Sequence, residues 1–318
     1  MSTLDASPEL SALVRGMTLV ADGVLAIDLV PAPGSTAAWP SWEPGAHIDL
    51  VLPGAPVRQY SLWGDPADGV LRIAVLLEPE SRGGSAYVHR TLRPGDIVTV
   101  RGPRNHFVLE PAAEYLFVAG GIGITPLLPM VRRARELGVP WSLVYLGSSA
   151  GRMPFLDELA GFGDGVVLVP GDRVERADLG ALLAAHPGAL VYACGPERML
   201  GELQGLLADG DRLRLEYFAA PETEAGAPAA GSFTVRLERT GVDLEVTEDM
   251  TLIEAMRGAG VEVLSDCEEG ICGSCETGVI SGEVDHRDFV LTKQERERND
   301  CLMVCVSRSA CPLLVLDA

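Results

Sequence analysis

Hydrophobic and polar residues alternate in short runs over about the first 110 positions of the chain. Turns rich in Pro, Gly, Asp and Arg separate these runs, and β-branched residues within them are typical of strands. The four clearest runs read AHIDLVL (46–52), RQYSLWG (58–64), VLRIAVLLE (70–78) and DIVTVRG (96–102). Several short strands in succession predict an antiparallel β-barrel or sandwich.

From Glu114 onward the hydrophobic pattern changes. A buried strand, a glycine loop and a helix are predicted in YLFVAGGIGITPLLPMVRRARELG (115–138), and the next strand is predicted in WSLVYLG (141–147). A second strand, tight turn and helix are predicted in ALVYACGPERMLGELQGLL (189–207). Alternation of strands and helices indicates an α/β domain with a parallel sheet covered by helices.

The segment AAPETEAGAPAAG (219–231) contains Ala, Pro, Gly and Glu without apolar periodicity, and it is typical of a linker. We therefore expect a multidomain chain with a β-barrel at 1–112, an α/β domain at 113–218, the linker at 219–231 and a C-terminal domain at 232–318. The C-terminal domain holds six of the seven cysteines, with 18 acidic and 8 basic residues, a net charge of −10.

Three cysteines lie close together in SDCEEGICGSCETG (265–278). Cys267 and Cys272 are separated by four residues, Cys272 and Cys275 by two, and Cys305 follows later. This spacing is that of plant-type [2Fe–2S] centres. Three thiolates can reach one cluster only if the loop curls tightly with its amide hydrogens inward, and its glycines permit that curl because glycine accepts positive φ.

A structural zinc site and buried free thiols are the two alternatives to a cluster. Structural zinc usually takes paired C-x2-C units, and the loop has one. Cys301 and Cys305 are both candidates for the fourth ligand. We favour Cys305, because flanking LMV and VS residues predict a strand that would hold it rigidly, and we expect Cys311 to be a packed thiol.

The loop GGIGITP (120–126) follows a predicted strand and opens a helix. We expect Thr125 to be its N-cap and Pro126 its first residue, so that bare amides at the helix N-terminus favour a pyrophosphate. By itself the loop could be only a tight turn, but CGP (194–196) ends a second strand, and two such loops define a nucleotide crevice. The candidate nucleotide-binding residues are Gly120, Gly121, Gly123, Thr125, Cys194, Gly195 and Pro196. For Cys194, the alternative is a small buried thiol.

Candidate flavin-binding residues alternate along the predicted strand RQYSL (58–62). Arg58 and Tyr60 share one face of the strand, while Gln59 and Ser61 share the other. An arginine suits a phosphate, a tyrosine suits an aromatic ring and a serine hydroxyl suits a ring nitrogen, so together they would suit a flavin. An ordinary amphipathic strand is the alternative. Glycine amides in SRGGS (81–85) offer a second phosphate cradle. Its candidate residues are Arg82, Gly83, Gly84 and Ser85, and Phe218 in EYF (216–218) could stack on a ring.

Composition narrows the class of protein further. The chain has 318 residues, is 47% hydrophobic and carries a formal net charge of −20. Such acidity argues against nucleic acid and against anionic membrane surfaces as partners. The N-terminal residues do not form a signal peptide, and no apolar run reaches the length of a membrane span. We expect a cytoplasmic protein.

Together these motifs resemble the phthalate dioxygenase reductase family, which includes vanillate O-demethylase reductases. The resemblance rests on Arg-x-Tyr-Ser, Arg-Gly-Gly-Ser, Gly-Gly-Ile-Gly-Ile-Thr-Pro, Cys-Gly-Pro, Glu-x-Phe and the C-terminal cysteine motif, and it covers essentially the whole chain in the family's domain order. It implies a flavin-binding β-barrel, an NAD(P)-binding α/β domain and a C-terminal β-grasp ferredoxin domain. It also supports Cys305 over Cys301 as the fourth cluster ligand.

The resemblance implies FMN rather than FAD, with Arg58 and the SRGGS loop on its phosphate. It further implies Tyr60 against the flavin ring, Ser61 near its N5, and Phe218 stacked where nicotinamide must enter. NADH is expected between GGIGITP and CGP, with NADPH possible. Members often carry Arg before the serine after the third nucleotide-domain strand, but this chain has Ser148 in YLGSS, and Arg152 or Arg173 could compensate.

We therefore expect an electron-transfer reductase, with Ser61 and Phe218 at the reacting centre. A flavin can take a hydride from nicotinamide and release electrons singly to an iron–sulfur cluster. The expected acceptor is the Rieske component of an oxygenase, with a cytochrome P450 as runner-up, and the reductase is expected to be a monomer. A non-catalytic redox sensor would not need both a flavin site and a nicotinamide site.

Overall fold

A computed structural model of the chain describes residues 9–35, 39–54, 57–79, 83–174, 177–207, 211–221 and 231–318. Packing divides the chain into two compact units, Met1–Glu216 and Tyr217–Ala318. The expected boundary at residue 112 falls inside the first unit, and most of the expected linker, residues 222–230, lies outside the described residues. The division into three domains and a linker therefore stays a prediction.

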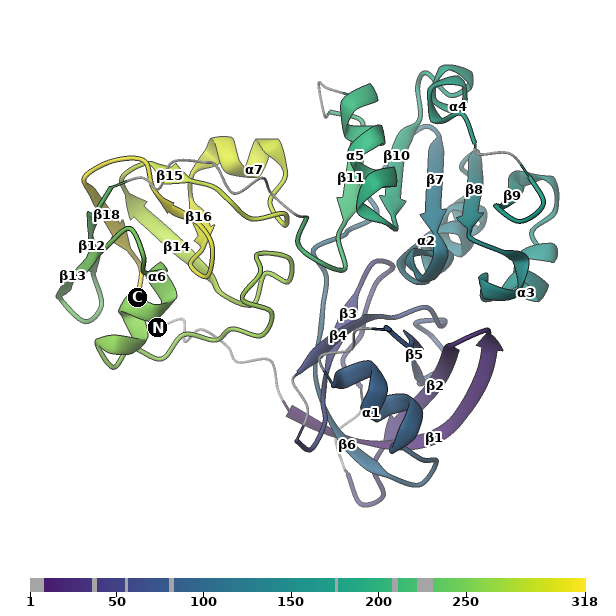
Figure 1. Ribbon diagram of the computed structural model, residues 1–318, viewed down its shortest axis with the longest axis horizontal. Coiled ribbons are helices and arrows are strands. Elements are labelled where there is room, and N and C mark those ends of the chain that lie inside the picture. The colour runs from purple at the N-terminus through teal and green to yellow at the C-terminus, as the bar shows by residue number, and fades with distance from the viewer. Residues whose placement is uncertain are drawn as a thin grey trace. The chain divides into compact units, whose positions relative to one another are not determined.

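The first unit begins with a six-stranded antiparallel sheet in the order β4-β3-β6-β1-β2-β5 (Figure 1). Its elements are β1 (Glu9–Ala21), β2 (Val24–Pro31), β3 (His47–Val51), β4 (Arg58–Ser61), β5 (Leu71–Leu76), β6 (Ile97–Arg104) and helix α1 (Gly84–Arg90). The four runs predicted as strands form β3, β4, β5 and β6. Within the described residues, the edge strands β4 and β5 share no ladder hydrogen bonds, so the predicted barrel is present in an open form.

Alternation along β3 places apolar and polar side chains on opposite faces of this sheet. Ile48 and Leu50 are fully buried in its apolar core. Asp49 points the other way and is also fully buried, and Arg104 Nη2 lies 2.6 Å from both of its carboxylate oxygens. A buried carboxylate is costly without such a partner, so β3 and β6 need this ion pair in order to pack together.

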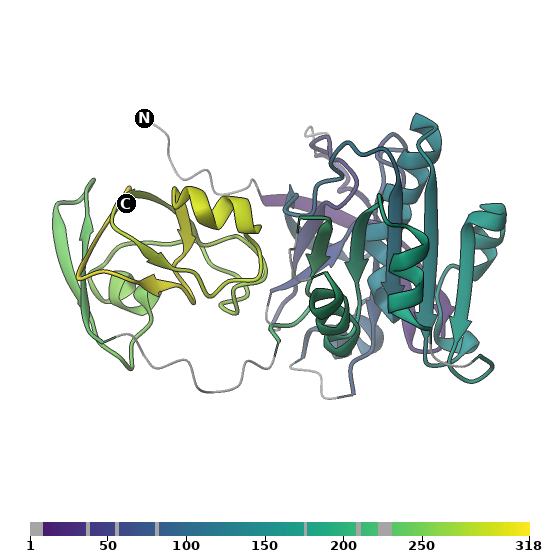
Figure 2. The ribbon, with the colours of Figure 1, turned by 90° about the horizontal axis from the view of Figure 1, so that it is seen from above.

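The first unit continues with a parallel sheet in the order β11-β10-β7-β8-β9, whose strands run side by side in Figure 2. Its strands are β7 (Tyr115–Gly120), β8 (Trp141–Gly147), β9 (Val166–Pro170), β10 (Leu190–Cys194) and β11 (Leu213–Glu216). Strand order reverses between β7 and β10, and ligands of such sheets bind at the carboxyl ends of the strands at that point. The predicted parallel sheet is confirmed, and both predicted loops, GGIGITP and CGP, lie at its reversal point.

Helices α2 (Ile124–Leu137), α3 (Leu156–Ala160), α4 (Leu179–Ala185) and α5 (Glu197–Leu206) alternate with the parallel strands, together with 3-10 turns η1 (Gly121–Gly123), η2 (Ala150–Arg152) and η3 (Gly163–Gly165). Helix α2 buries its apolar residues against the sheet, where Leu127, Met130 and Val131 are fully enclosed. Among the described helices, none has both the length and the apolar character needed to cross a membrane.

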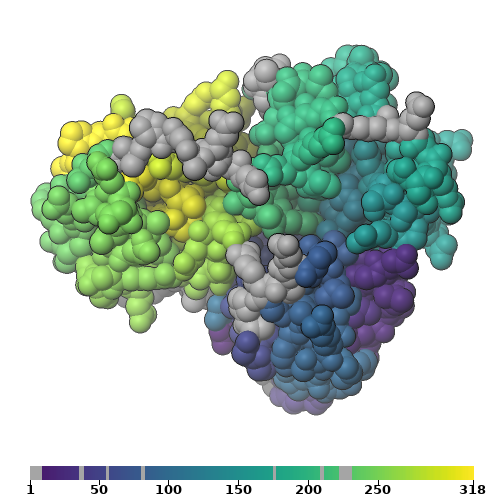
Figure 3. All heavy atoms as spheres, in the orientation of Figure 1, coloured from purple at the N-terminus to yellow at the C-terminus, as the bar shows by residue number. Residues whose placement is uncertain are grey.

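The second unit (green to yellow in Figure 3) contains a five-stranded sheet in the order β13-β12-β18-β14-β16 and a two-stranded sheet, β15-β17. Its elements are β12 (Phe233–Leu237), β13 (Val242–Val246), α6 (Leu252–Gly258), β14 (Glu276–Ser281), β15 (Val284–Asp285), α7 (Lys293–Arg298), β16 (Cys301–Met303), β17 (Arg308–Ser309) and β18 (Leu313–Leu316). Helix α6 starts with a capping box on Thr251 and packs Leu252 and Met256 into the core. This arrangement confirms the predicted β-grasp ferredoxin fold.

We expect Asp49→Ala to lower the free energy of unfolding of the first unit by about 3–5 kcal/mol, because it leaves the Arg104 guanidinium without its carboxylate in a largely buried position. Urea unfolding followed by tryptophan fluorescence measures this loss. The control is Glu9→Gln, which removes the more exposed ion pair with Arg101 and should cost no more than about 1 kcal/mol. Equal losses in the two variants would contradict the importance assigned to the buried pair.

Candidate functional site

Three polar side chains meet where strand ends from both sheets of the first unit come together. Ser61 ends β4, Cys194 ends β10 and Glu216 ends β11. The Ser61 hydroxyl donates to Glu216 Oε2 at 3.3 Å, and the Cys194 thiol is also hydrogen-bonded to the Glu216 carboxyl. The structure therefore brings together Ser61, predicted for the flavin, and Cys194, predicted for the nucleotide.

The electrostatics of this cluster favour neutral groups. Burial raises the pKa of Glu216 to about 8, and hydrogen bonds from Ser61 and Cys194 oppose that rise. Burial also raises the pKa of the Cys194 thiol well above its usual range, with the Glu216 carboxyl adding to the effect. At neutral pH the site therefore presents an uncharged carboxyl, a hydroxyl and a thiol.

Sequence reasoning did not select Glu216 as a site residue. The available signal was its position at the end of an edge strand of the parallel sheet, directly beside Cys194 in the register of β10 and β11. Side chains that end neighbouring parallel strands meet at one edge of the sheet. Because the run RLRLE was not recognised as a strand, this signal was missed.

The two nucleotide loops touch through their glycines. A Cβ atom on Gly123 would lie 2.2 Å from the Cys194 carbonyl oxygen, and one on Gly120 would lie 2.5 Å from Pro196 Cδ. From the other side, a Cβ atom on Gly195 would lie 2.8 Å from the Gly120 Cα. Real Cβ atoms do not approach so closely, so glycine is required on both loops for this contact. The loops GGIGITP and CGP therefore lie in direct contact, and the nucleotide crevice that they would form stays a prediction.

The start of α2 differs from the prediction. The helix begins at Ile124 with Gly123 as its N-cap, and Thr125 instead donates its hydroxyl to the Ile122 carbonyl oxygen at 3.0 Å. The expectation that Thr125 caps the helix and Pro126 starts it is wrong, because the 3-10 turn η1 runs directly into the helix. Gly121, the first residue of that turn, has a φ of +55° and open space where a side chain would lie.

The candidate phosphate-binding residues lie around the start of α1. The Arg58 side chain packs so closely on Gly84 that a Cβ atom there would lie 2.6 Å from Arg58 Cγ. Gly83 precedes the helix with a φ of +111°, and Ser85 Oγ accepts from the Glu78 amide at 3.3 Å. Arg82 lies outside the described residues. An arginine over a glycine backbone is an arrangement that fits a phosphate group.

The other two β4 candidates occupy opposite faces of the strand. Tyr60 packs against the core of the antiparallel sheet, and burial raises the pKa of its hydroxyl to about 12. Gln59 faces the same side as Ser61, and its side-chain nitrogen is buried without a hydrogen-bond partner among the described residues. A buried donor without a partner is costly in a folded protein, so Gln59 also fits a site that a ligand completes.

The loops after β8 and β9 lie against each other at the expected adenosine end. Asp172 accepts from the Ala150 amide at 3.2 Å, which places its carboxylate beside the loop that contains Ser148. Arg173 lies 3.9 Å from the same carboxylate, with most of its side chain exposed, and Arg152 is also exposed. This end of the site therefore carries both a carboxylate and arginine side chains.

The cysteine loop of the second unit has the curled shape that its glycines allow. Cys272, Cys275 and Cys305 are buried, and Cys267 is partly exposed. The Cys305 thiol is hydrogen-bonded to the sulfurs of Cys267 and Cys275. Backbone amides point at these sulfurs, since Glu269 N lies 3.3 Å from Cys267 Sγ and Ser274 N lies 3.5 Å from Cys272 Sγ.

Inward amides and converging sulfurs fit an iron–sulfur cluster, because amide hydrogens stabilise its negative charge. Within the described residues, no three His, Cys, Asp or Glu side chains are arranged as ligands of a single metal ion. A [2Fe–2S] cluster does not require such a group, since each of its two irons takes two thiolates. The donor set therefore fits the cluster better than it fits zinc.

Cys301 lies in a different environment from Cys305. It sits at the start of β16 beside Asp300 and Glu276, and burial followed by these carboxylates raises the pKa of its thiol to about 12. Cys311 is partly exposed and hydrogen-bonded within its own turn to Ser309. The sulfur contacts of the cysteine loop thus involve Cys305 rather than Cys301.

Phe218 is the last of the residues predicted for the reacting centre. It belongs to the second unit and is 44% exposed. Its expected stacking on a flavin ring remains a prediction.

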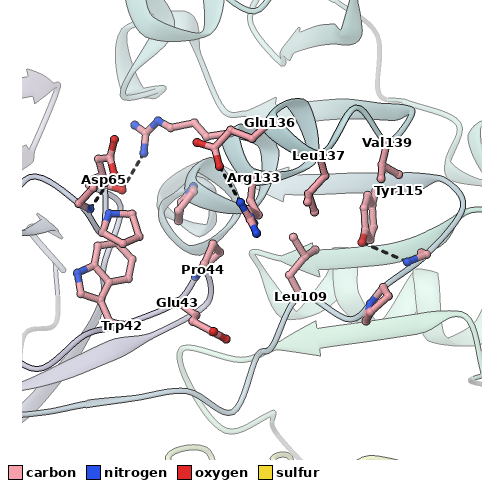
Figure 4. A pocket seen from close by; sticks show the side chains of 17 residues that line it. Trp42, Glu43, Pro44, Asp65, Leu109, Tyr115, Arg133, Glu136, Leu137 and Val139 are labelled. Atoms are coloured by element: carbon pink, nitrogen blue, oxygen red, sulfur yellow. Dashed lines mark hydrogen bonds and ion pairs between the residues drawn. The ribbon is translucent and has the colours of Figure 1, made fainter.

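A cavity of about 730 Å³ opens elsewhere in the first unit, beside the C-terminal half of α2 (Figure 4). Trp42, Leu109 and Leu137 are among its apolar lining residues, and the Arg133–Glu136 ion pair also lines it. None of the residues predicted for flavin, nucleotide or cluster lines it. The candidate site is therefore separate from this cavity.

Comparison with known proteins agrees with these features. The 2Fe-2S iron-sulfur cluster binding domain family matches residues 235–310. The phenoxybenzoate dioxygenase subunit beta of Ectopseudomonas oleovorans is 44% identical over 324 residues and covers all of both chains. The vanillate O-demethylase oxidoreductase of Pseudomonas sp. is 40% identical over 317 residues, with 96% of this chain and 98% of the relative covered.

Several solved structures are similar over 98% of this chain, and two of them are phthalate dioxygenase reductase and a cytochrome P450 monooxygenase. Phthalate dioxygenase reductase, described as a modular structure for electron transfer from pyridine nucleotides to [2Fe-2S], has a TM-score of 0.68 and 34% identity, with 98% of its own chain covered. An intact type IV self-sufficient cytochrome P450 monooxygenase has a TM-score of 0.92 and 43% identity. This chain spans only 41% of that P450's length.

We expect Cys305→Ser to abolish the cluster and Cys301→Ser to retain it, because only the Cys305 sulfur contacts those of the cysteine loop. Iron and sulfide content, together with visible absorption of the purified variants, measures the outcome. Serine has nearly the size of cysteine, so the two substitutions are matched in bulk. Loss of iron in Cys301→Ser with normal iron in Cys305→Ser would identify Cys301 as the ligand.

Proposed function

This chain belongs to the phthalate dioxygenase reductase family of electron-transfer reductases, and on that premise we propose that it carries electrons from NADH through FMN to a [2Fe–2S] cluster and on to the Rieske component of an oxygenase. A bound flavin supplies the conversion of one hydride into two single electrons, which a cluster accepts one at a time. The protein's own residues bind and align the two carriers.

The observation that carries this proposal is the meeting of Ser61, Cys194 and Glu216 at the strand-order reversal of the parallel sheet. The end of β4 belongs to the proposed flavin-binding strand, and Cys194 belongs to the loop proposed for nicotinamide. Their contact with one carboxyl group would let a flavin edge and a nicotinamide share this place. Proximity of the two rings is the main requirement of hydride transfer.

The candidate phosphate site at Arg58 and Gly84 supports FMN rather than FAD as the flavin. Arg58 packed on Gly84 offers one guanidinium and nearby backbone amides, which suits a single terminal phosphate. We propose that Arg82 completes this cradle, that Tyr60 contacts the flavin ring and that Phe218 stacks where nicotinamide enters. Gln59 would use its buried side-chain nitrogen in the same site.

The choice of NADH follows from the Asp172 carboxylate beside the loop after β8. A carboxylate can hydrogen-bond a ribose hydroxyl, whereas it repels the additional phosphate of NADPH. Arg173 lies 3.9 Å away and only partly offsets this charge. We therefore propose a preference for NADH.

The acceptor is proposed from the relatives and from charge. The similar phenoxybenzoate and vanillate proteins carry names of oxygenase systems, which favours an oxygenase as the acceptor. A self-sufficient P450 monooxygenase is similar to this chain over 41% of its own length, so a separate P450 is the second candidate. The net charge of −10 over residues 232–318 favours a basic docking face on either acceptor. A monomer working in the cytoplasm completes the proposal.

Anaerobic mixing with NADH should bleach the flavin absorbance first and the cluster bands afterwards, since hydride must arrive before single electrons can leave. Stopped-flow absorbance measures both phases, and NADPH should act at least about tenfold more slowly because of the Asp172 charge. Adding an oxidised Rieske component or a P450 to the reduced protein then compares the rates at which each restores the cluster bands. An unchanged spectrum with both nucleotides would rule out the reductase, and a flavin-free protein would favour a redox sensor.

The rate of flavin reduction should fall as pH rises through about 8, because Glu216 ionises there and its negative charge opposes delivery of hydride beside it. Well below pH 8 the carboxyl is neutral and the rate should be constant. Glu216→Gln should remove this inflection and keep a rate within about tenfold of the low-pH value, since the amide mimics the neutral carboxyl. A wild-type inflection that persists in Glu216→Gln would show that another group is responsible.

A further inference from the structure

In the second unit, residues 285–291 form a second layer that packs against the cysteine loop. The Phe289 amide donates to the Gly270 carbonyl oxygen at 2.8 Å, and the Gly270 amide is hydrogen-bonded to the Cys305 sulfur. Gly270 has a φ of +72°, and a Cβ atom there would lie 3.2 Å from the Asp288 Cα. Residues 288–289 are therefore in direct contact with the loop proposed to carry the cluster.

Asp288 is a buried carboxylate in this second layer. One of its oxygens, Oδ2, accepts from the Leu291 amide at 2.8 Å and from the Val290 amide at 3.1 Å. The other, Oδ1, is buried without a hydrogen-bond partner in the described part of the chain, with His286 Nδ1 3.7 Å away. Two backbone amides do not neutralise a full negative charge, so a counter-charge is needed nearby.

Arg296 on helix α7 supplies that counter-charge. Its Nη2 lies 3.7 Å from Asp288 Oδ2, and it also donates to the Asp288 carbonyl oxygen. Its Nε is buried without a hydrogen-bond partner among the described residues. The pair thus places one negative and one positive charge behind the cysteine loop, held apart by more than hydrogen-bonding distance.

We propose that Asp288 and Arg296 are positioning residues whose opposed charges set the reduction potential of the cluster held by the cysteine loop. This inference rests on the proposed function, since it requires the cluster. Reduction adds negative charge to the cluster, so a neighbouring carboxylate opposes it and a neighbouring guanidinium favours it. Salt screens buried charges much less than exposed ones, so the influence of the buried Asp288 carboxylate persists at physiological ionic strength.

The test is redox titration of the full-length protein with its cofactors, following the cluster by EPR and visible absorption. Asp288→Asn should favour the reduced cluster about threefold or more, because the amide keeps the turn but removes the charge. Arg296→Gln should disfavour it by a similar factor. For a one-electron carrier a tenfold change corresponds to about 59 mV, so shifts of this size are measurable in both directions.

Matched controls lie close to the tested pair. Asp285 is more exposed than Asp288, and Arg298 on helix α7 is more exposed than Arg296. Asp285→Asn and Arg298→Gln therefore make the same changes of charge at more exposed positions, and each should shift the equilibrium by less than about twofold. Opposite shifts in Asp288→Asn and Arg296→Gln, with small shifts in the controls, would support the inference.

Shifts of the same sign in Asp288→Asn and Arg296→Gln, or no shift with the cluster intact, would overturn it. If Asp288→Asn fails to retain the cluster, the sign of the Arg296→Gln shift decides, and anything but a downward shift counts against the inference. A wild-type protein without cluster bands would instead refute the proposed function. The two failures are therefore distinguishable in one set of samples.

Discussion

The backbone contact between the loops that end β7 and β10 determines the rest of the candidate site. Gly123 lies against the Cys194 carbonyl group, and Gly195 lies against Gly120, at separations that leave no room for a Cβ atom on either side. This approach brings the Cys194 thiol to the edge of the sheet where Glu216 ends the next strand. A larger residue in either loop would separate the side chains that the proposed chemistry needs together.

Burial gives the site its chemical character. Loss of contact with water raises the pKa of the Glu216 carboxyl to about 8, and the hydrogen bonds from Ser61 and Cys194 offset this rise only in part. An uncharged carboxyl at neutral pH suits a place where hydride, which carries negative charge, is to be delivered. By contrast, Asp49 is fully buried but has the Arg104 guanidinium at 2.6 Å, and it serves the fold rather than the site.

The two units use the same devices for different groups. In the first unit, glycines let two loops approach each other, and strand ends supply the polar side chains. In the second unit, Gly270 and Gly273 let one loop curl so that its amides face sulfur atoms. In both units, glycines let backbone amides approach a site that a side chain would block. Anionic cofactors are commonly held by backbone amides in this way.

The sequence alone determined the features that depend on local pattern. Strand alternation predicted β3 to β6, and strand–loop–helix succession predicted the parallel sheet. Cysteine spacing predicted the [2Fe–2S] domain, because the spacing of ligands within one loop is a local property. The tertiary structure decided what depends on distant segments. It started α2 at Ile124 rather than Pro126, because a preceding turn runs into the helix. It also brought Glu216 within hydrogen-bonding distance of Ser61, which lies 155 residues away in the sequence. No local sequence pattern encodes such a contact.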